Sequence, residues 1–207
     1  MRRDEQIMLT EEFVRHNMKG YDSGHDWWHI ERVRKLALYI NEKEAMGDPF
    51  LVDLTALLHD TADSKFASDN PEPGYVMISD FMKKNGMSDI SKQVLAVIKR
   101  ISFSSIAAQD CQPDPLLCVV QDADRLDAIG AIGIARAFNY GGFRNNPIYI
   151  PGEKPEDTGK STIGHFYGKL LKLKDLMNTS TGHKIAEERH EILEKFLEQF
   201  YSEWNFI

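Results

Sequence analysis

The chain has 207 residues, enough for one domain with a substantial core but short for two independent ones. Hydrophobic residues make up 42% of it and the formal net charge is −7, which argues against a nonspecific nucleic-acid binder, because such proteins need a basic surface. No apolar run approaches the roughly 20 residues that span a bilayer, and no apolar signal core opens the chain, so we expect a single cytoplasmic domain (1–207) that contacts neither nucleic acid nor membrane.

Helical periodicity dominates the chain and predicts an all-α fold, without a series of alternating strand segments. The predicted helices cover residues 5–18, 26–46, 49–60, 72–85, 88–101, 115–140, 161–178 and 182–204. Asp48-Pro49 and Asn70-Pro71 have the sequence of an N-cap followed by a first-turn proline, and Gly47 and Gly86 suit the left-handed residue that ends a helix. The connection 141–160 is long enough to be an active-site flap.

Polar side chains occur on the apolar side of these predicted helices. His29 lies four residues before Val33 and in register with the apolar stripe beyond it, so it points inward. Asp124 lies at spacings of four between two apolar residues and points inward for the same reason. The helix over 49–60 ends at or just after His59-Asp60, where a carboxylate is unfavourable unless a cation is close.

Two imidazoles and two carboxylates from three segments can hold one divalent metal ion. Buried and unpaired, the carboxylates would cost several kcal/mol or become protonated, whereas a divalent cation keeps them ionised and the imidazoles neutral. Two nitrogen and two carboxylate ligands suit Mn²⁺, which we favour, and also Fe²⁺, Co²⁺, Ni²⁺ or Mg²⁺. Octahedral coordination leaves positions for water and a phosphate oxygen.

The pattern H…HD…D resembles the HD-domain metal-dependent phosphohydrolase superfamily. WWHIERV (27–33), LLHDTADSKF (57–66) and QDADRLDAIGAIGIARAF (121–138) are similar to the motifs of its bacterial YpgQ-type branch, and the similarity continues through 165–179 and 186–204. This resemblance implies an HD-domain helical bundle with the metal site between helices. The implied ligands are His29, His59, Asp60 and Asp124.

The same resemblance implies how many metal ions to expect and which aspartate of the last motif is the ligand. Dinuclear members use further histidines between the HD pair and the last aspartate, but no histidine occurs from 61 to 164, so we expect one metal. Asp124 is preferred over Asp122 because its Asp-Arg-Leu context matches the family, and a helical offset of about 200° lets only one of the two face the metal. Asp127 is either a carboxylate that supports the ligands or a solvated one.

Two residues after the HD pair are candidates for catalysis. Asp63 could orient the attacking water or move its proton, which requires a carboxylate within hydrogen-bond reach; the alternative is a cap for the next segment. Lys65 could bind a phosphate group, and the alternative is an exposed loop lysine.

Five basic residues are candidates for substrate binding. His25 lies one helical turn before the first ligand, although it could equally precede the helix as a surface residue. Arg32 and Arg125 could contact phosphate or form ordinary ion pairs. His165 and Lys169 are four residues apart on a predicted helix, so both could reach a polyphosphate, and the alternative is ordinary surface.

The resemblance therefore implies a metal-dependent phosphohydrolase that cleaves a phosphate ester or anhydride. The resemblance implies a small phosphorylated substrate, a nucleoside mono- or triphosphate, with release of phosphate or pyrophosphate left open. The alternative is a regulatory module that binds metal and nucleotide without turnover. The long apolar helices are also compatible with a homodimer.

Overall fold

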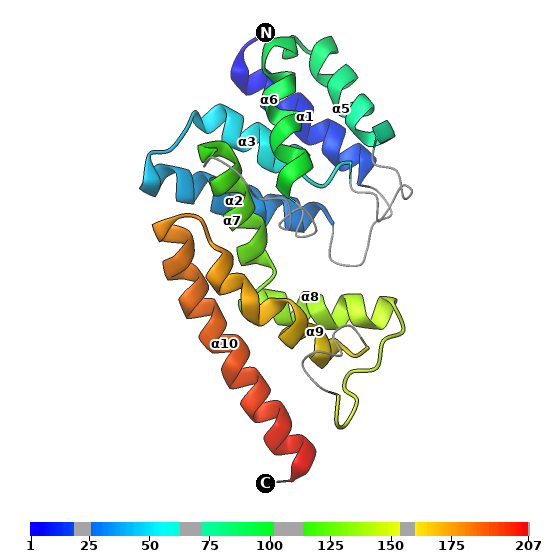
Figure 1. The fold of residues 1–207 in the computed structure, drawn as a ribbon. Coiled ribbons are helices and arrows are strands. Elements are labelled where there is room, and N and C mark those ends of the chain that lie inside the picture. The colour runs from blue at the N-terminus through cyan, green and yellow to red at the C-terminus, as the bar shows by residue number, and fades with distance from the viewer. Residues whose placement is uncertain (19–25, 63–71, 102–113, 154–159, 207) are drawn as a thin grey trace. The chain divides into compact units, whose positions relative to one another are not determined.

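The structure, a computed structural model, describes residues 1–18, 26–62, 72–101, 114–153 and 160–206 (Figure 1). Every regular element in these ranges is helical, so the all-α prediction is confirmed. The elements are α1 (Arg3–Asn17), α2 (Trp27–Glu44), α3 (Pro49–Leu58), α5 (Glu72–Lys84), α6 (Ser88–Ile101), α7 (Pro115–Asp127), α8 (Gly130–Phe143), α9 (Thr162–Gly168), the 3₁₀ helix η2 (Leu170–Leu176) and α10 (Ser180–Asn205). Among the helices of these ranges, none is both long and apolar enough to cross a membrane.

The chain divides into two compact units, Met1–Ala123 and Asp124–Ile207. The division falls inside α7, which runs as one helix from Pro115 to Asp127. The expectation of a single domain over 1–207 stays a prediction.

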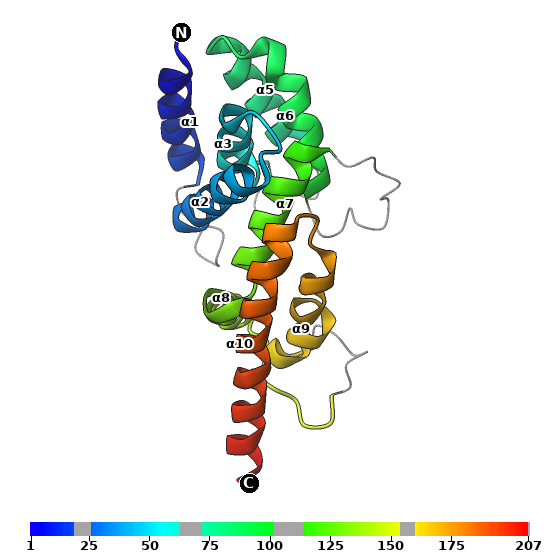
Figure 2. The same cartoon turned by 90° about the vertical axis from the view of Figure 1, so that its left-hand side faces the viewer.

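The first unit is organised around α2 and α3, which lie side by side as an antiparallel helical hairpin (Figure 1); Figure 2 views this hairpin from its connecting turn. Asp26 caps α2 by accepting from the backbone N–H of His29, and Asp48 caps α3 by accepting from that of Phe50, with Pro49 in the first turn as predicted. The caps fix where each helix begins. The buried core of this unit gathers apolar side chains from five helices, namely Val14, Ile30, Leu54, Leu57, Leu58, Ile78, Met82, Val94 and Ile98.

The second unit contains α8, α9, η2 and α10. Its core is aromatic where α8, α9 and α10 meet, because the ring of Phe166 lies 5.6 Å from that of Phe196 and 6.1 Å from that of Phe138. The ring of Tyr149, from the predicted flap, packs edge to face on Phe200 of α10 at 5.8 Å. This part of the 141–160 connection is therefore anchored to the longest helix, while residues 154–159 lie outside the described residues.

Two predicted helices are interrupted. The helix expected over 115–140 breaks at Gly130, whose φ of 74° is left-handed, so α7 ends at Asp127 and α8 begins afresh. The helix expected over 161–178 breaks at Lys169, with φ −135°, and continues as the 3₁₀ helix η2.

The residues predicted to begin and end helices agree with the structure in part. Gly86 is left-handed with φ 72° as expected, but Gly47 is not the residue that ends α2, because Ala45 takes the left-handed position with φ 51°. Asn41 Nδ2 donates to the Gly47 carbonyl at 3.1 Å, so this turn is held by a side chain rather than by a glycine conformation. The predicted cap Asn70-Pro71 lies outside the described residues.

Candidate metal centre

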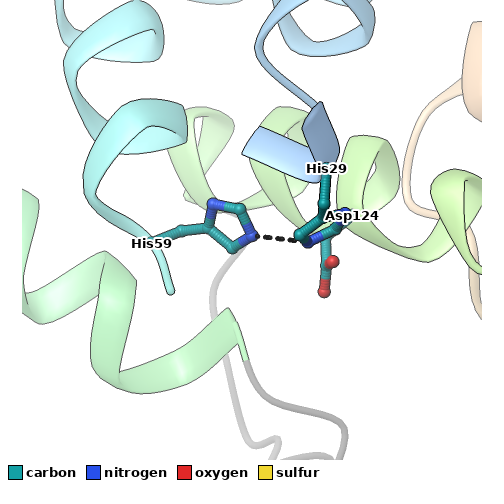
Figure 3. Close-up of side chains that lie close together, drawn as sticks. All are labelled: His29, His59 and Asp124. Atoms are coloured by element: carbon teal, nitrogen blue, oxygen red, sulfur yellow. Dashed lines mark hydrogen bonds between the residues drawn. The ribbon is translucent and has the colours of Figure 1, made fainter. Parts of the chain in front are cut away.

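His29 lies in the first turn of α2 and is fully buried, with an exposed fraction of 0%. The N-cap Asp26 accepts a hydrogen bond of 2.9 Å from its backbone N–H, which holds the start of the helix in place. The prediction that His29 points inward is confirmed. Its imidazole extends away from the helix toward the end of α3 (Figure 3).

His59 follows α3 directly as its C-cap and is also buried. Its Nδ1 lies 2.8 Å from the carbonyl oxygen of Ala56 and donates to it, which leaves the lone pair on Nε2. That Nε2 atom lies 3.3 Å from Nε2 of His29. The dashed line in Figure 3 joins these two rings. Two imidazole nitrogens at this distance need a shared proton or a cation between them, because two facing lone pairs repel.

Asp60 contacts both imidazoles from the residue after His59. Its Oδ2 lies 3.3 Å from Nε2 of His29, and its Oδ1 lies 3.5 Å from Nε2 of His59. Only 12% of this side chain is exposed. Helix α3 ends at Leu58 with His59 as its C-cap, slightly earlier than the predicted end at or just after Asp60. The carboxylate of Asp60 therefore lies directly beyond the helix end, where the helix dipole disfavours negative charge and a cation stabilises it.

Asp124 is carried by α7, which reaches it without a break from the first unit. One carboxylate oxygen of Asp124 and one nitrogen each of His29 and His59 all lie within 4.8 Å of one another. These three side chains form a group that could hold a metal ion, and Asp60 adjoins it through the two contacts above. All four residues predicted as ligands are thus brought together.

The donor set fits a divalent metal ion. The hydrogen bond to Ala56 fixes the tautomer of His59 that a metal ligand requires. The paired nitrogens and the half-buried carboxylates supply neutral and negative donors, which match Mn²⁺, Fe²⁺ and similar ions.

The two catalytic candidates, Asp63 and Lys65, and the substrate candidate His25 lie outside the described residues. Arg32 and Lys169 are half-buried, on α2 and directly after α9.

The remaining substrate candidates, Arg125 and His165, are buried and half-buried rather than on the open surface. Arg125 is 6% exposed and its guanidinium donates to the carbonyl oxygen of Leu176. Burial, with a smaller contribution from the charge of Lys169, lowers the pKa of His165 to about 4, so this imidazole is neutral at pH 7. Any contact that His165 makes with a phosphate at that pH is a hydrogen bond rather than an ion pair.

Asp127 is buried, so the solvated alternative is wrong, and the role of supporting the ligands stays a prediction. It is 1% exposed, and Arg136 of α8 donates to its Oδ2 at 2.8 Å. Arg189 of α10 donates to the carbonyl of the neighbouring Leu126 at 2.5 Å. These contacts hold the C-terminal end of α7. No local sequence pattern predicted these contacts, because their partners lie on other helices, 9 and 63 residues further along the chain.

A family model described as "HD domain" matches residues 27–129, the stretch that contains all four candidate ligands. YpgQ of Bacillus subtilis is 41% identical over 182 residues, which are 86% of this chain and 83% of that protein. The chain belongs to the HD-domain superfamily, as its motifs predicted.

Solved structures give the same assignment over nearly the whole length. An HD-superfamily hydrolase from Bacillus thuringiensis superposes with a TM-score of 0.79 at 43% identity, covering 99% of both chains. Bacillus subtilis YpgQ in complex with ADP superposes with a TM-score of 0.78 at 36% identity, covering 96% of this chain and 97% of that one.

Proposed function

We propose that this protein is a metal-dependent phosphohydrolase that acts on a nucleotide. The observation that carries the proposal is the convergence of His29, His59, Asp60 and Asp124, with the two imidazole Nε2 atoms 3.3 Å apart and Asp60 in contact with both. Membership of the HD-domain superfamily supports it, since an HD-superfamily hydrolase has the same fold. We expect one metal ion, with Mn²⁺ favoured.

A nucleotide is the favoured substrate because the related YpgQ has been solved with ADP. A nucleoside mono- or triphosphate would be cleaved at an ester or an anhydride bond, and the same ligand set serves release of phosphate or of pyrophosphate.

Each residue has a distinct role in this proposal. A divalent ion, when bound, would polarise a phosphoryl oxygen and lower the pKa of a water molecule, so that hydroxide is available as the nucleophile at neutral pH. The hydrogen bond from His59 Nδ1 to Ala56 aims Nε2 at the ion. Asp63 accepts the proton of the attacking water, and Lys65 steadies the negative charge on the phosphate.

The five basic candidates supply the remaining contacts to phosphate. Arg125 has part of its donor capacity taken by Leu176, and His165 is uncharged at neutral pH.

The test is to strip the protein of metal and add back Mn²⁺, Mg²⁺, Ni²⁺ or Co²⁺ singly. Each sample is incubated with a panel of nucleoside mono- and triphosphates, and phosphate and pyrophosphate are quantified separately. We expect metal-dependent turnover, fastest with Mn²⁺. His29→Ala should abolish it, while an exposed histidine on α10, replaced in His183→Gln, should not.

The alternative is a regulatory module that binds metal and nucleotide without turnover. It predicts tight nucleotide binding in the presence of metal, measured by calorimetry, with no phosphate or pyrophosphate released by any metal in the series. That result would replace the hydrolase proposal.

A further inference from the structure

Arg34 of α2 joins three helices of the first unit. Its Nε and Nη2 donate to Oδ1 and Oδ2 of Asp53 on α3, the second at 3.0 Å, and its Nη1 donates to Glu11 on α1. The side chains of Arg34, Asp53 and Glu11 are only 20%, 14% and 30% exposed. A guanidinium that binds both oxygens of one carboxylate fixes the relative orientation of its partner as well as the distance.

This contact lies midway along the hairpin that carries two of the candidate ligands. The hairpin is closed at one end, where Asn41 Nδ2 donates to the Gly47 carbonyl at 3.1 Å. At its open end His29 and His59 face each other, with their Nε2 atoms 3.3 Å apart. Between the two ends, Arg34 and Asp53 form a direct polar cross-link from α2 to α3.

Metal coordination tolerates little movement of the helices. A slip of α2 along α3 by one residue moves His29 by about 1.5 Å, whereas ligand distances at a metal are held to within roughly 0.2 Å. The hydrophobic contacts between the two helices are not directional, so they resist separation better than sliding. A bidentate ion pair resists sliding because its two hydrogen bonds must both keep their geometry.

We propose that Arg34 is a positioning residue of the metal centre: its fork on Asp53 sets the register of α2 against α3 and so holds the imidazoles of His29 and His59 at the distance a single ion requires. The inference rests on the proposed metal site and adds to it a residue that touches none of the ligands.

The test compares two variants. Arg34→Met keeps most of the side-chain length and loses the hydrogen-bond donors, whereas Arg34→Lys keeps the positive charge and loses the bidentate contact with Asp53. Affinity for Mn²⁺ is measured by calorimetry on stripped protein, and the visible absorption of the Co²⁺-loaded protein reports the coordination geometry. We expect both variants to bind Mn²⁺ at least about tenfold more weakly, as loss of outer supporting contacts usually does. The Co²⁺ bands should also change in shape.

Two controls separate positioning from general stability. Lys35→Met removes the neighbouring cation, which pairs within α2 with Glu31 at 3.0 Å and, among the described residues, forms no ion pair with another helix, so Mn²⁺ affinity should not change. Ile78→Val removes a methyl group from α5 in the core of the same unit and so lowers the unfolding free energy without touching the Arg34 contacts. When it is compared with an Arg34 variant that loses the same unfolding free energy, Ile78→Val should leave the Co²⁺ bands unaltered. Asp53→Asn replaces Arg34→Met if the latter does not fold.

The possible failures are distinguishable. If the wild-type protein binds no Mn²⁺, or His29→Ala binds it as tightly as the wild type, the proposed metal site is wrong and this inference falls with it. If the wild type and His29→Ala behave as expected, but the Arg34 variants bind Mn²⁺ like the wild type or lose no more affinity than Ile78→Val, only the positioning role is overturned.

Discussion

The two imidazole Nε2 atoms of the candidate site lie too close for both to carry a proton. His59 Nδ1 already donates to Ala56, so the neutral ring has its lone pair at Nε2, facing His29 Nε2 at 3.3 Å. Asp60 places an oxygen near each of these nitrogens. A divalent cation satisfies this arrangement better than a single proton, because it accepts both lone pairs and balances the carboxylate.

Replacing Asp60 by Ala should remove metal and activity together. The change takes away the carboxylate that contacts both imidazoles, and His59 loses its neighbour at the end of α3. Metal content by elemental analysis and turnover should fall in parallel. The control is Asp80→Ala, whose side chain on α5 is 69% exposed and which should keep both. Full metal occupancy in Asp60→Ala would show that Asp60 is not a ligand.

Asp63→Asn should keep most of the bound metal and lose hydrolysis. The amide preserves the size and hydrogen bonding of the side chain but no longer accepts a proton. Metal content and turnover across a pH range, measured on the same preparation, separate the two properties. Unchanged turnover would assign Asp63 to capping, and equal loss of metal would make it a ligand.

His165 should contribute to the pH dependence of stability. Burial, and to a lesser extent Lys169, lowers its pKa from 6.5 to about 4, so between these values the unfolded chain binds a proton that the folded chain does not. The contribution is therefore fully present above pH 6.5 and is lost as the pH falls through 4. It amounts to at most about 3 kcal/mol.

Unfolding in urea at pH 7.5 and at pH 4.5 measures this contribution. The loss of unfolding free energy between the two pH values should be smaller in His165→Gln than in the wild type. His183→Gln, at an exposed position of α10, should show the wild-type loss. An identical loss in all three proteins would mean that the pKa of His165 is not lowered.

The candidate ligands could be predicted from the sequence because each lies in a short motif with a local reason for its placement. His29 lies in register with the apolar stripe of α2, and Asp60 lies just after the end of α3. The partners of Arg34 and Asp127 could not be predicted, because their contacts join helices that only the tertiary fold brings together. The roles of Asp63 and Lys65 remain predictions from the motif alone.

At the level of helices, local sequence signals predicted where helices occur better than where they break. The boundaries of α6, Ser88–Ile101, agree with the prediction residue for residue, and the cap at Asp48 is confirmed. The break at Lys169 has no proline to mark it, and Ala45 adopts a left-handed conformation that normally costs about 1 kcal/mol outside glycine. The turn after α2 is held by a side-chain hydrogen bond from Asn41 to Gly47, which the turn residues considered in the sequence did not predict.

The break between α7 and α8 gives a prediction for Gly130. An alanine there would be held at φ 74°, and its Cβ would lie 3.0 Å from Cγ of Arg189, so Gly130→Ala should lower the unfolding free energy by about 1 kcal/mol or more. Gly142→Ala is the matched control, because this glycine lies within α8 and its Cβ would meet nothing within 4 Å. That variant should be neutral or stabilised by about 0.4–1 kcal/mol. Equal effects in urea unfolding would contradict the left-handed break.

At the level of the whole molecule, the HD-domain match and the shared fold have different extents. The match ends at residue 129, yet the solved relatives align with 96–99% of the chain. The helices after it, α8 to α10, therefore belong to the fold that these relatives share. The division into two units falls within α7, immediately before Asp124, so the helix that carries the last candidate ligand is continuous with the part that carries the others.

The central claim is that His29, His59, Asp60 and Asp124 hold one divalent ion. Anomalous diffraction from crystals of the whole protein loaded with Mn²⁺ tests it most directly, because the signal locates the ion itself. The account predicts one strong peak, with the two imidazole Nε2 atoms and an oxygen of each carboxylate at roughly 2.0–2.4 Å. The absence of a peak among these four side chains at saturating Mn²⁺, or a peak held by other residues, would contradict it.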